Sequence, residues 1–311
     1  MQTSAALVTG GAGFIGSHVV DALVDAGHSV RVLDDLFTGS KDNVNPAADL
    51  IVASVADEDA VRAAVDGCDR LFHLGAHRAV GRSVTDPLAT DLANVHGTLT
   101  VLDAAHRAGV RRVVSASSSS VYGGSAPLPT AETAPLTPRS PYAVSKMAGE
   151  HYCRVYSELF GVETVSVRFF NVYGPRQRPD SPYAAVIPLF IEALRKSAPP
   201  TVHGDGRQSR DFTYVADAVA ATLAAADAPA DRCAGRAYNI APGESHDLLE
   251  VLDILGRLLG VVPRPEHTAP RSGDVRLSKA DPSAARRDLG VSCATGFEEG
   301  LRRTVEWFEA G

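Results

Sequence analysis

Residues 5–16 read AALVTGGAGFIG, an apolar run followed by glycines at positions 10, 11, 13 and 16. The run predicts a buried strand, and a helical pattern continues to about Ala26. Glycines between strand and helix allow a tight turn, close approach of the backbone to a pyrophosphate, and close helix–strand packing. A glycine cluster alone also fits an ordinary turn. The strand before it and the helix after it, whose first N–H groups can face phosphates, favour a dinucleotide site.

The next apolar run, Val30–Leu33, ends in Asp34 and Asp35, about 18 residues after Gly16. A carboxylate at the tip of the second strand accepts hydrogen bonds from the adenosine ribose hydroxyls and repels a 2′-phosphate. The pattern therefore predicts NAD rather than NADP as the cofactor.

Short apolar runs alternate with helical stretches through the first half of the chain. The predicted strands are residues 5–9, 30–33, 50–52, 70–74, 113–117 and 164–168. This alternation predicts an α/β fold of the Rossmann type, a doubly wound parallel sheet whose ligands bind at the carboxyl ends of the strands. After residue 171 the chain is richer in loops, with helical patterns at 186–195, 248–259 and 297–308. We expect a NAD-binding domain at 1–170, rejoined by 211–240, and a smaller, mainly helical substrate domain at 171–210 and 241–311.

Tyr142 and Lys146 lie four residues apart, after Ser140 and Pro141, which suit the cap and the first position of a helix. Residues at this spacing share one helical face. An ammonium beside a phenol favours the phenolate, and lowering a phenol pKa by about three units takes about 4 kcal/mol. A tyrosine packed on a helix beside a solvated lysine has the same spacing. The accompanying dinucleotide motif favours a base that takes a proton from a hydroxyl.

Composition restricts the class of partner. The chain has 311 residues, 45% hydrophobic and 22% charged, with a net charge of −7. This charge argues against nucleic acid or an anionic membrane as partners. The four cysteines form no close pair and no apolar stretch reaches 18 residues, so we expect a cytoplasmic protein. His73 and His77 have no third ligand near them in the sequence, so no metal is expected.

Several motifs together resemble the extended short-chain dehydrogenase/reductase family, and within it the nucleotide-sugar 4-epimerases. They are residues 9–16, 73–76, 117–123, 140–146, 168–175, 204–206 and 209–212. The resemblance implies inversion of carbon 4 of a UDP-sugar through a transient 4-keto intermediate, with NAD bound throughout. It also implies a homodimer formed by helices near 94–107 and 142–160. The apolar residues Leu99, Val101, Leu102, Val155 and Leu159 could serve either that interface or the core.

The same resemblance assigns roles to individual residues. Tyr142 is the acid/base, Lys146 holds the nicotinamide ribose and lowers the tyrosine pKa, and Ser118 bonds the sugar hydroxyl that is oxidised. The implied cofactor contacts are Gly10, Gly13, Phe14, Ile15, Gly16, Asp34, Leu74, Gly75, Ala76, Tyr142, Lys146 and Phe170. The implied substrate contacts are Ser118, Ser119, Ser120, Tyr142, Asn171, Arg178, Arg210 and Arg271.

Ser119 and Ser120 bear on the reaction type. Dehydratases of this family carry Asp-Glu at these positions, because loss of water needs a second acid and base. Two hydroxyls favour epimerisation. The alternatives are an NDP-sugar dehydratase or reductase of the same family and, in another class, a non-catalytic NAD-sensing binding protein.

The identity of the sugar is less clear. Arg178 falls where members that act on uronic acids place a cation, although a diphosphate contact or an exposed loop charge suits it equally. Residues 181–186 are more similar to the neutral-sugar and N-acetyl-sugar members, and Asn171 stands where the uronate enzymes often have Thr. The sequence slightly favours UDP-glucuronate/UDP-galacturonate, with UDP-glucose/UDP-galactose close behind.

Arg78 falls near the cofactor phosphates of some epimerases, but a helix-surface charge fits it equally.

Overall fold

The computed structural model describes residues 5–180, 184–270 and 275–310. Its centre is a seven-stranded sheet in the order β11-β6-β5-β4-β1-β2-β3, in which every pairing is parallel. The strands are β1 (Ala5–Thr9), β2 (Ser29–Asp34), β3 (Asp49–Val52), β4 (Arg70–His73), β5 (Arg112–Ser118), β6 (Glu163–Phe169) and β11 (Arg236–Ile240). The predicted Rossmann-type sheet is confirmed. β11 is a seventh strand that the predicted ranges do not name.

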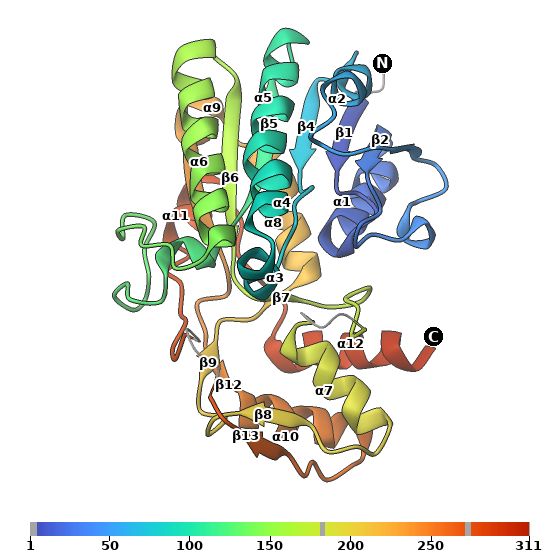
Figure 1. The fold of residues 1–311 in the computed structure, drawn as a ribbon, viewed down its shortest axis with the longest axis vertical. Coiled ribbons are helices and arrows are strands. Elements are labelled where there is room, and N and C mark those ends of the chain that lie inside the picture. Colours follow the sequence, from blue (N-terminus) through green and yellow to red (C-terminus); the bar gives the residue numbers. More distant parts are fainter. Residues whose placement is uncertain (1–4, 181–183, 271–274, 311) are drawn as a thin grey trace.

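Both faces of the sheet are buried, as a parallel sheet requires. Along β1, Leu7 packs into one apolar cluster, whereas Ala6 and Val8 pack into the other. On one face α2 (Glu58–Val65), α5 (Gly97–Arg107) and α6 (Pro141–Phe160) pack side by side, and on the other α1 (Phe14–Asp25) packs against α8 (Val215–Asp227) (Figure 1). The site therefore has a rigid, double-sided support.

A smaller part lies beyond the carboxyl ends of the strands (Figure 1). In it α10 (Leu248–Leu259) packs against α7 (Val186–Arg195) and α12 (Phe297–Ala310). Three two-stranded pairs accompany them: β7 (Val172–Tyr173) with β10 (Thr213–Tyr214), β8 (Thr201–His203) with β13 (Glu266–Thr268), and β9 (Ser209–Arg210) with β12 (His246–Asp247). The predicted helices at 186–195 and 248–259 have these bounds, and the third continues to Ala310.

Shorter elements complete the chain. They are η1 (Lys41–Asn43), α3 (Val80–Thr85), α4 (Pro87–Asp91), the π-helical segment η2 (Leu92–His96), η3 (Ser119–Tyr122), α9 (Ala230–Cys233) and α11 (Ser283–Asp288). None of the helices in the described ranges is long and apolar enough to cross a lipid bilayer.

The first helix is also joined to the loop that follows β7. Arg176 forms an ion pair with Asp21 of α1, with Nη1 and Oδ2 2.7 Å apart. His18, one turn earlier on α1, hydrogen-bonds the carbonyl oxygen of Pro175 at 3.0 Å. Arg176 has a φ of 66°, a left-handed conformation that costs a non-glycine residue free energy. These two contacts hold it there.

Candidate active site

A cleft of about 910 Å³ runs along the carboxyl ends of the strands. Its floor comes from the loops and residues after β1, β2, β4, β5 and β6, and its outer wall from residues 123–130 and 275–278. This is the edge at which ligands of doubly wound sheets bind. The size suits a dinucleotide together with a second ligand.

Backbone segments approach closely at the glycine-rich turn. A side chain at Gly10, whose φ is 71°, would place its Cβ 2.6 Å from the backbone nitrogen of Gly75. A Cβ on Gly16 would lie 2.0 Å from the carbonyl oxygen of Gly10. Helix α1 begins after Gly13, whose lack of a side chain leaves the first N–H groups without a side-chain cap. Such a cradle of uncapped N–H groups suits an anion such as a pyrophosphate.

Asp34 lies at the end of β2 and is largely buried. Its carboxylate accepts hydrogen bonds from the backbone N–H of Ala12 at 2.9 Å and of Leu36 at 2.8 Å. Burial raises its pKa, and these two donors oppose that effect. A carboxylate offers about four acceptor positions, so lone pairs remain for ribose hydroxyls. The glycine cradle and this carboxylate together fit a dinucleotide.

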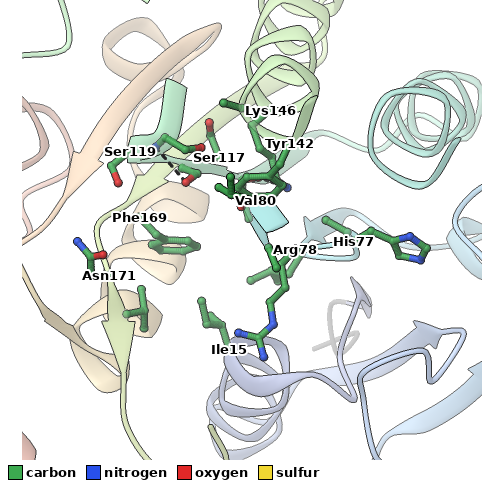
Figure 2. Close-up of a pocket in the computed structure, with 18 of the residues that line it drawn as sticks. Ile15, His77, Arg78, Val80, Ser117, Ser119, Tyr142, Lys146, Phe169 and Asn171 are labelled. Atoms are coloured by element: carbon green, nitrogen blue, oxygen red, sulfur yellow. Dashed lines mark hydrogen bonds between the residues drawn. The ribbon is translucent and has the colours of Figure 1, made fainter. Parts of the chain in front are cut away.

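Tyr142 and Lys146 lie together above the same edge (Figure 2), and Ser118 lines the same cleft. Ser140 caps α6 by accepting a hydrogen bond from the N–H of Ala143, and Pro141 is the first helical residue, as predicted. Burial raises the pKa of Tyr142, whereas a hydrogen bond from Ser118 and the positive charge of Arg78 lower it. The arrangement can therefore pass a proton between a hydroxyl and the phenol.

Lys146 is held against β5. Its ammonium donates to the carbonyl oxygen of Ala116 at 2.8 Å, and burial lowers its pKa to about 8. An ammonium with a lowered pKa and one fixed acceptor keeps two donors for a ligand such as a ribose.

His73 is buried and neutral, and its pKa is lowered to about 3 by burial. The hydroxyl of Thr98 donates its only proton to the Asn94 carbonyl at 2.5 Å, so it accepts from Nε2 of His73 at 2.9 Å. Nδ1 then accepts from the hydroxyl of Thr9 at 2.8 Å. Both ring nitrogens are therefore used to tie β4 to β1 and α5. Among the described residues, no three His, Cys, Asp or Glu side chains gather as metal ligands would.

The structure brings most of the predicted site residues into this one cleft. Those lining it are Gly10, Gly13, Phe14, Ile15, Gly16, Asp34, Leu74, Gly75, Ala76, Ser118, Ser119, Ser120, Tyr142, Lys146, Phe170, Asn171 and Arg210. Arg178 is not among them: its guanidinium is exposed and forms an ion pair with Asp180. Arg271 and residues 181–183 lie outside the described residues.

Phe37 lines the cleft and Asn94 supports its wall, and neither was predicted from the sequence. Arg78 belongs to the cleft rather than to a helix surface, and its side chain extends toward Ile15 (Figure 2). Phe37 stacks on His77 with ring centroids 4.1 Å apart. Asn94 positions the backbone of His77 through two hydrogen bonds of 2.7 and 3.0 Å. Asn94 lies in the π-helical segment η2, and such segments are frequent at functional sites.

Comparison with known proteins agrees with this geometry. The model of the NAD dependent epimerase/dehydratase family matches residues 6–241. The chain is 39% identical over 309 residues to the UDP-glucose 4-epimerase of Mycolicibacterium smegmatis, covering 97% of each chain.

Two solved structures are also similar. The UDP-glucose 4-epimerase of Thermotoga maritima, solved with UDP-glucose, superposes with a TM-score of 0.95 at 34% identity, covering 98% of this chain and 99% of that one. The UDP-glucose 4-epimerase of Thermus thermophilus, solved with NAD, gives a TM-score of 0.91 at 36% identity, with 99% of both chains covered.

Proposed function

The chain belongs to the NAD-dependent epimerase/dehydratase family, and we propose that it is a UDP-sugar 4-epimerase that keeps NAD bound through each cycle. One observation carries the proposal: Ser118, Tyr142 and Lys146 line the same cleft as the glycine cradle. A binding protein that only sensed NAD would not need a poised proton acceptor.

The residues of the chain divide the work among proton transfer, orientation and binding. We assign the cofactor to the cradle at Gly10, Gly13 and Gly16, with Asp34 on the adenosine ribose and Lys146 on the nicotinamide ribose. When bound, NAD takes up hydride from a carbinol carbon and returns it. Tyr142 accepts the proton of the hydroxyl on carbon 4 and later gives it back.

Binding of the sugar nucleotide falls to the opposite wall of the cleft. Ser118 aligns the reacting hydroxyl on the Tyr142 phenol, while Arg210 and Asn171 hold the diphosphate so that the sugar can turn over. A guanidinium suits this task because its planar donors match phosphate oxygens. Arg271, outside the described residues, keeps its proposed part in the same contact. Residues 1–170 and 211–240 would then bind the cofactor, and 171–210 and 241–311 the sugar nucleotide.

Ser119 and Ser120 support epimerisation over dehydration. Loss of water requires an acid and a base beside the exocyclic carbon. These two positions line the cleft with hydroxyls. At neutral pH a serine hydroxyl is neither an effective general acid nor a base that removes a proton from carbon. We therefore propose that the sugar leaves with unchanged mass.

For the sugar we propose the UDP-glucose/UDP-galactose pair. The relatives named above act on UDP-glucose by their names, and Arg178 is engaged with Asp180 outside the cleft. This weakens the only sequence argument for a uronate, so UDP-glucuronate/UDP-galacturonate becomes the second candidate.

We also propose a homodimer. Val101 and Leu102 belong to the protein's own core, so they are not available to a partner. Other apolar side chains are exposed on the helices that pack around α6. They are Val80 and Val84 of α3, Leu88 of α4, Leu92 of η2, and Val144, Leu159 and Phe160 of α6.

The test is incubation of the purified protein with a panel of UDP-glucose, UDP-galactose, UDP-glucuronate and UDP-N-acetylglucosamine. We expect interconversion of the first two, read as inverted stereochemistry at carbon 4 by NMR, without a change of mass. A product lighter by one water would identify a dehydratase instead, and no product with any sugar would leave the NAD-sensing alternative.

A further inference from the structure

Three polar side chains form one row across the sheet, at a depth where parallel strands are normally apolar. Arg168 of β6 stands in register with Ser117 of β5 on one side and with Asn239 of β11 on the other. In-register residues of adjacent strands project from the same face of a sheet. All three are buried, with at most 6% of each residue exposed. Such a row requires partners from outside the sheet.

Glu150 of α6 supplies the first partner. Its Oε1 accepts from the Ser117 hydroxyl at 2.5 Å and from Nε of Arg168 at 2.8 Å, and its Oε2 accepts from Nη2 of Arg168 at 2.7 Å. Glu150 and Arg168 are 8% and 5% exposed. The two-point contact fixes both the distance and the rotation of the carboxylate relative to the guanidinium.

The remaining donor of Arg168 reaches the segment that follows the catalytic serine. Its Nη1 donates to the hydroxyl of Tyr122 at 2.7 Å, and that hydroxyl donates to Oδ1 of Asn239 at 2.7 Å. Tyr122 ends η3, the short helix that starts directly after Ser118. The network therefore anchors the chain on both sides of Ser118, through Ser117 before it and Tyr122 after it.

Helix α6, which carries Glu150, also carries the other proposed catalytic groups. Tyr142, Lys146 and Glu150 are spaced four residues apart on α6. Lys146 contacts the carbonyl oxygen of Ala116 and Glu150 contacts the hydroxyl of Ser117, so two consecutive residues of β5 are tied to two successive turns of α6. A helix tied in this way can neither slide nor rotate relative to the strand end.

We propose that Glu150 and Arg168 are positioning residues, and that their ion pair holds the strand end that carries Ser118 against the helix that carries Tyr142. The proposal rests on the proposed epimerase function. Neither residue lines the cleft, so both act through Ser117, Tyr122 and α6. If the ion pair between Glu150 and Arg168 is weakened, the positions of Ser118 and Tyr142 relative to each other are no longer fixed. A misplacement of about 1 Å can lower the rate about a hundredfold.

The test compares Glu150→Gln with a matched variant elsewhere. The matched variant is Glu163→Gln. It removes the carboxylate from a different ion pair, the one between Glu163 and the buried Arg112, which lies away from the cleft. We expect Glu150→Gln to lower kcat about 10- to 100-fold with little change in the KM for UDP-glucose, and to keep bound NAD. Glu163→Gln should lower thermal stability but leave kcat unchanged. Equal kcat losses in the two variants, or no loss in folded Glu150→Gln, would overturn the proposal.

The double variant Glu150→Gln/Arg168→Met removes both charges. Replacing a buried ion pair by neutral groups often restores stability. We expect recovery of the melting temperature without recovery of kcat, because methionine cannot donate to Tyr122 and no guanidinium then fixes the orientation of the side chain at position 150. Recovery of both would show that the pair serves only charge balance, against the proposal.

A readout without substrate separates this proposal from the function. The groups that face the phenol of Tyr142 are Ser118 from β5, Arg78 from the loop after β4 and, one turn away, Lys146. The hydrogen bond from Ser118 lowers the pKa of Tyr142, so its loss in Glu150→Gln should raise the pKa seen by ultraviolet titration of tyrosinate, with Tyr142→Phe as the blank. An unchanged pKa contradicts the positioning role, whether or not the wild-type protein epimerises UDP-glucose.

Discussion

Lys146 donates a hydrogen bond to the carbonyl oxygen of Ala116, with Nζ and O 2.8 Å apart, at the end of the strand that carries Ser118. This contact places an ammonium where burial disfavours its charge. In the proposed function, this cost is accepted because the ammonium is then placed to bind a ribose and to stabilise a phenolate.

Replacing this lysine should raise stability and remove activity. Burial lowers the pKa of Lys146 from 10.5 to about 8, which bounds the cost of the charge at about 3 kcal/mol. Between these pH values the unfolded chain binds more protons, so stability at this site rises with pH through that window. Lys146→Met should melt higher than wild type at about pH 7, and the gain should shrink toward about pH 10. Thermal melts without NAD measure both, with exposed Lys196→Met as the control.

Tyr142→Phe should lower turnover about 100- to 10,000-fold, because it removes the group that accepts and returns the proton. NAD should stay bound, as measured by its absorbance after the protein is unfolded. Tyr152→Phe, on the same helix but outside the cleft, should retain full activity. Near-normal turnover by Tyr142→Phe would remove the tyrosine from the proposed reaction.

Gly10→Ala should abolish cofactor retention, because its Cβ would lie 2.6 Å from the backbone of Gly75 and the φ of 71° disfavours alanine. The two loops must separate to relieve the contact. Gly296→Ala is the matched change, since nothing lies within 4 Å of its Cβ. Equal NAD content in the two purified variants would show that the close approach does not form the cofactor site.

Arg210 and Arg178 should behave differently. Arg210 lines the cleft, and Arg210→Ala should raise the KM for UDP-glucose about tenfold or more by removing a diphosphate contact. Arg178→Ala should change kcat/KM for UDP-glucose and UDP-glucuronate equally and little. A selective loss of UDP-glucuronate turnover in Arg178→Ala would instead favour a uronate as the substrate.

Leu88→Asp should convert a dimer into a monomer. Leu88 is 81% exposed on α4, which packs against α3, η2 and α6, and a buried unpaired carboxylate at an interface is costly. Val262→Asp, 83% exposed beyond α10, should not change the oligomeric state. Sedimentation of wild type and both variants is the measurement, and a wild-type monomer would refute the dimer.

Much of the fold follows from local patterns. The turn at Gly10–Gly16 and the cap at Ser140 are set by residues adjacent in sequence, so the sequence predicts them well. β11 has Arg236 and Asn239 among its five residues, which interrupt an apolar pattern, so only its pairing with β6 identifies it as a strand. Long-range pairing of that kind leaves little local signal.

The site divides in the same way. Residues at strand ends, such as Asp34 and Ser118, are predicted because every parallel strand delivers its last residues to one edge. Phe37, Leu128 and Leu277 reach the cleft from loops, whose course depends on distant contacts. Arg178 shows the converse: a motif position suggested a sugar contact, and a local ion pair with Asp180 takes up the side chain.

The ion pair between Asp21 and Arg176 has a consequence for how the enzyme would meet its ligands. It joins helix α1, which follows the glycine turn, to the loop that follows β7. The two parts of the protein therefore cannot rotate apart without breaking this ion pair. In the proposed reaction, the substrate would then bind to a cleft that is already formed. The oxidised sugar would have to rotate inside that cleft without an opening of the two parts.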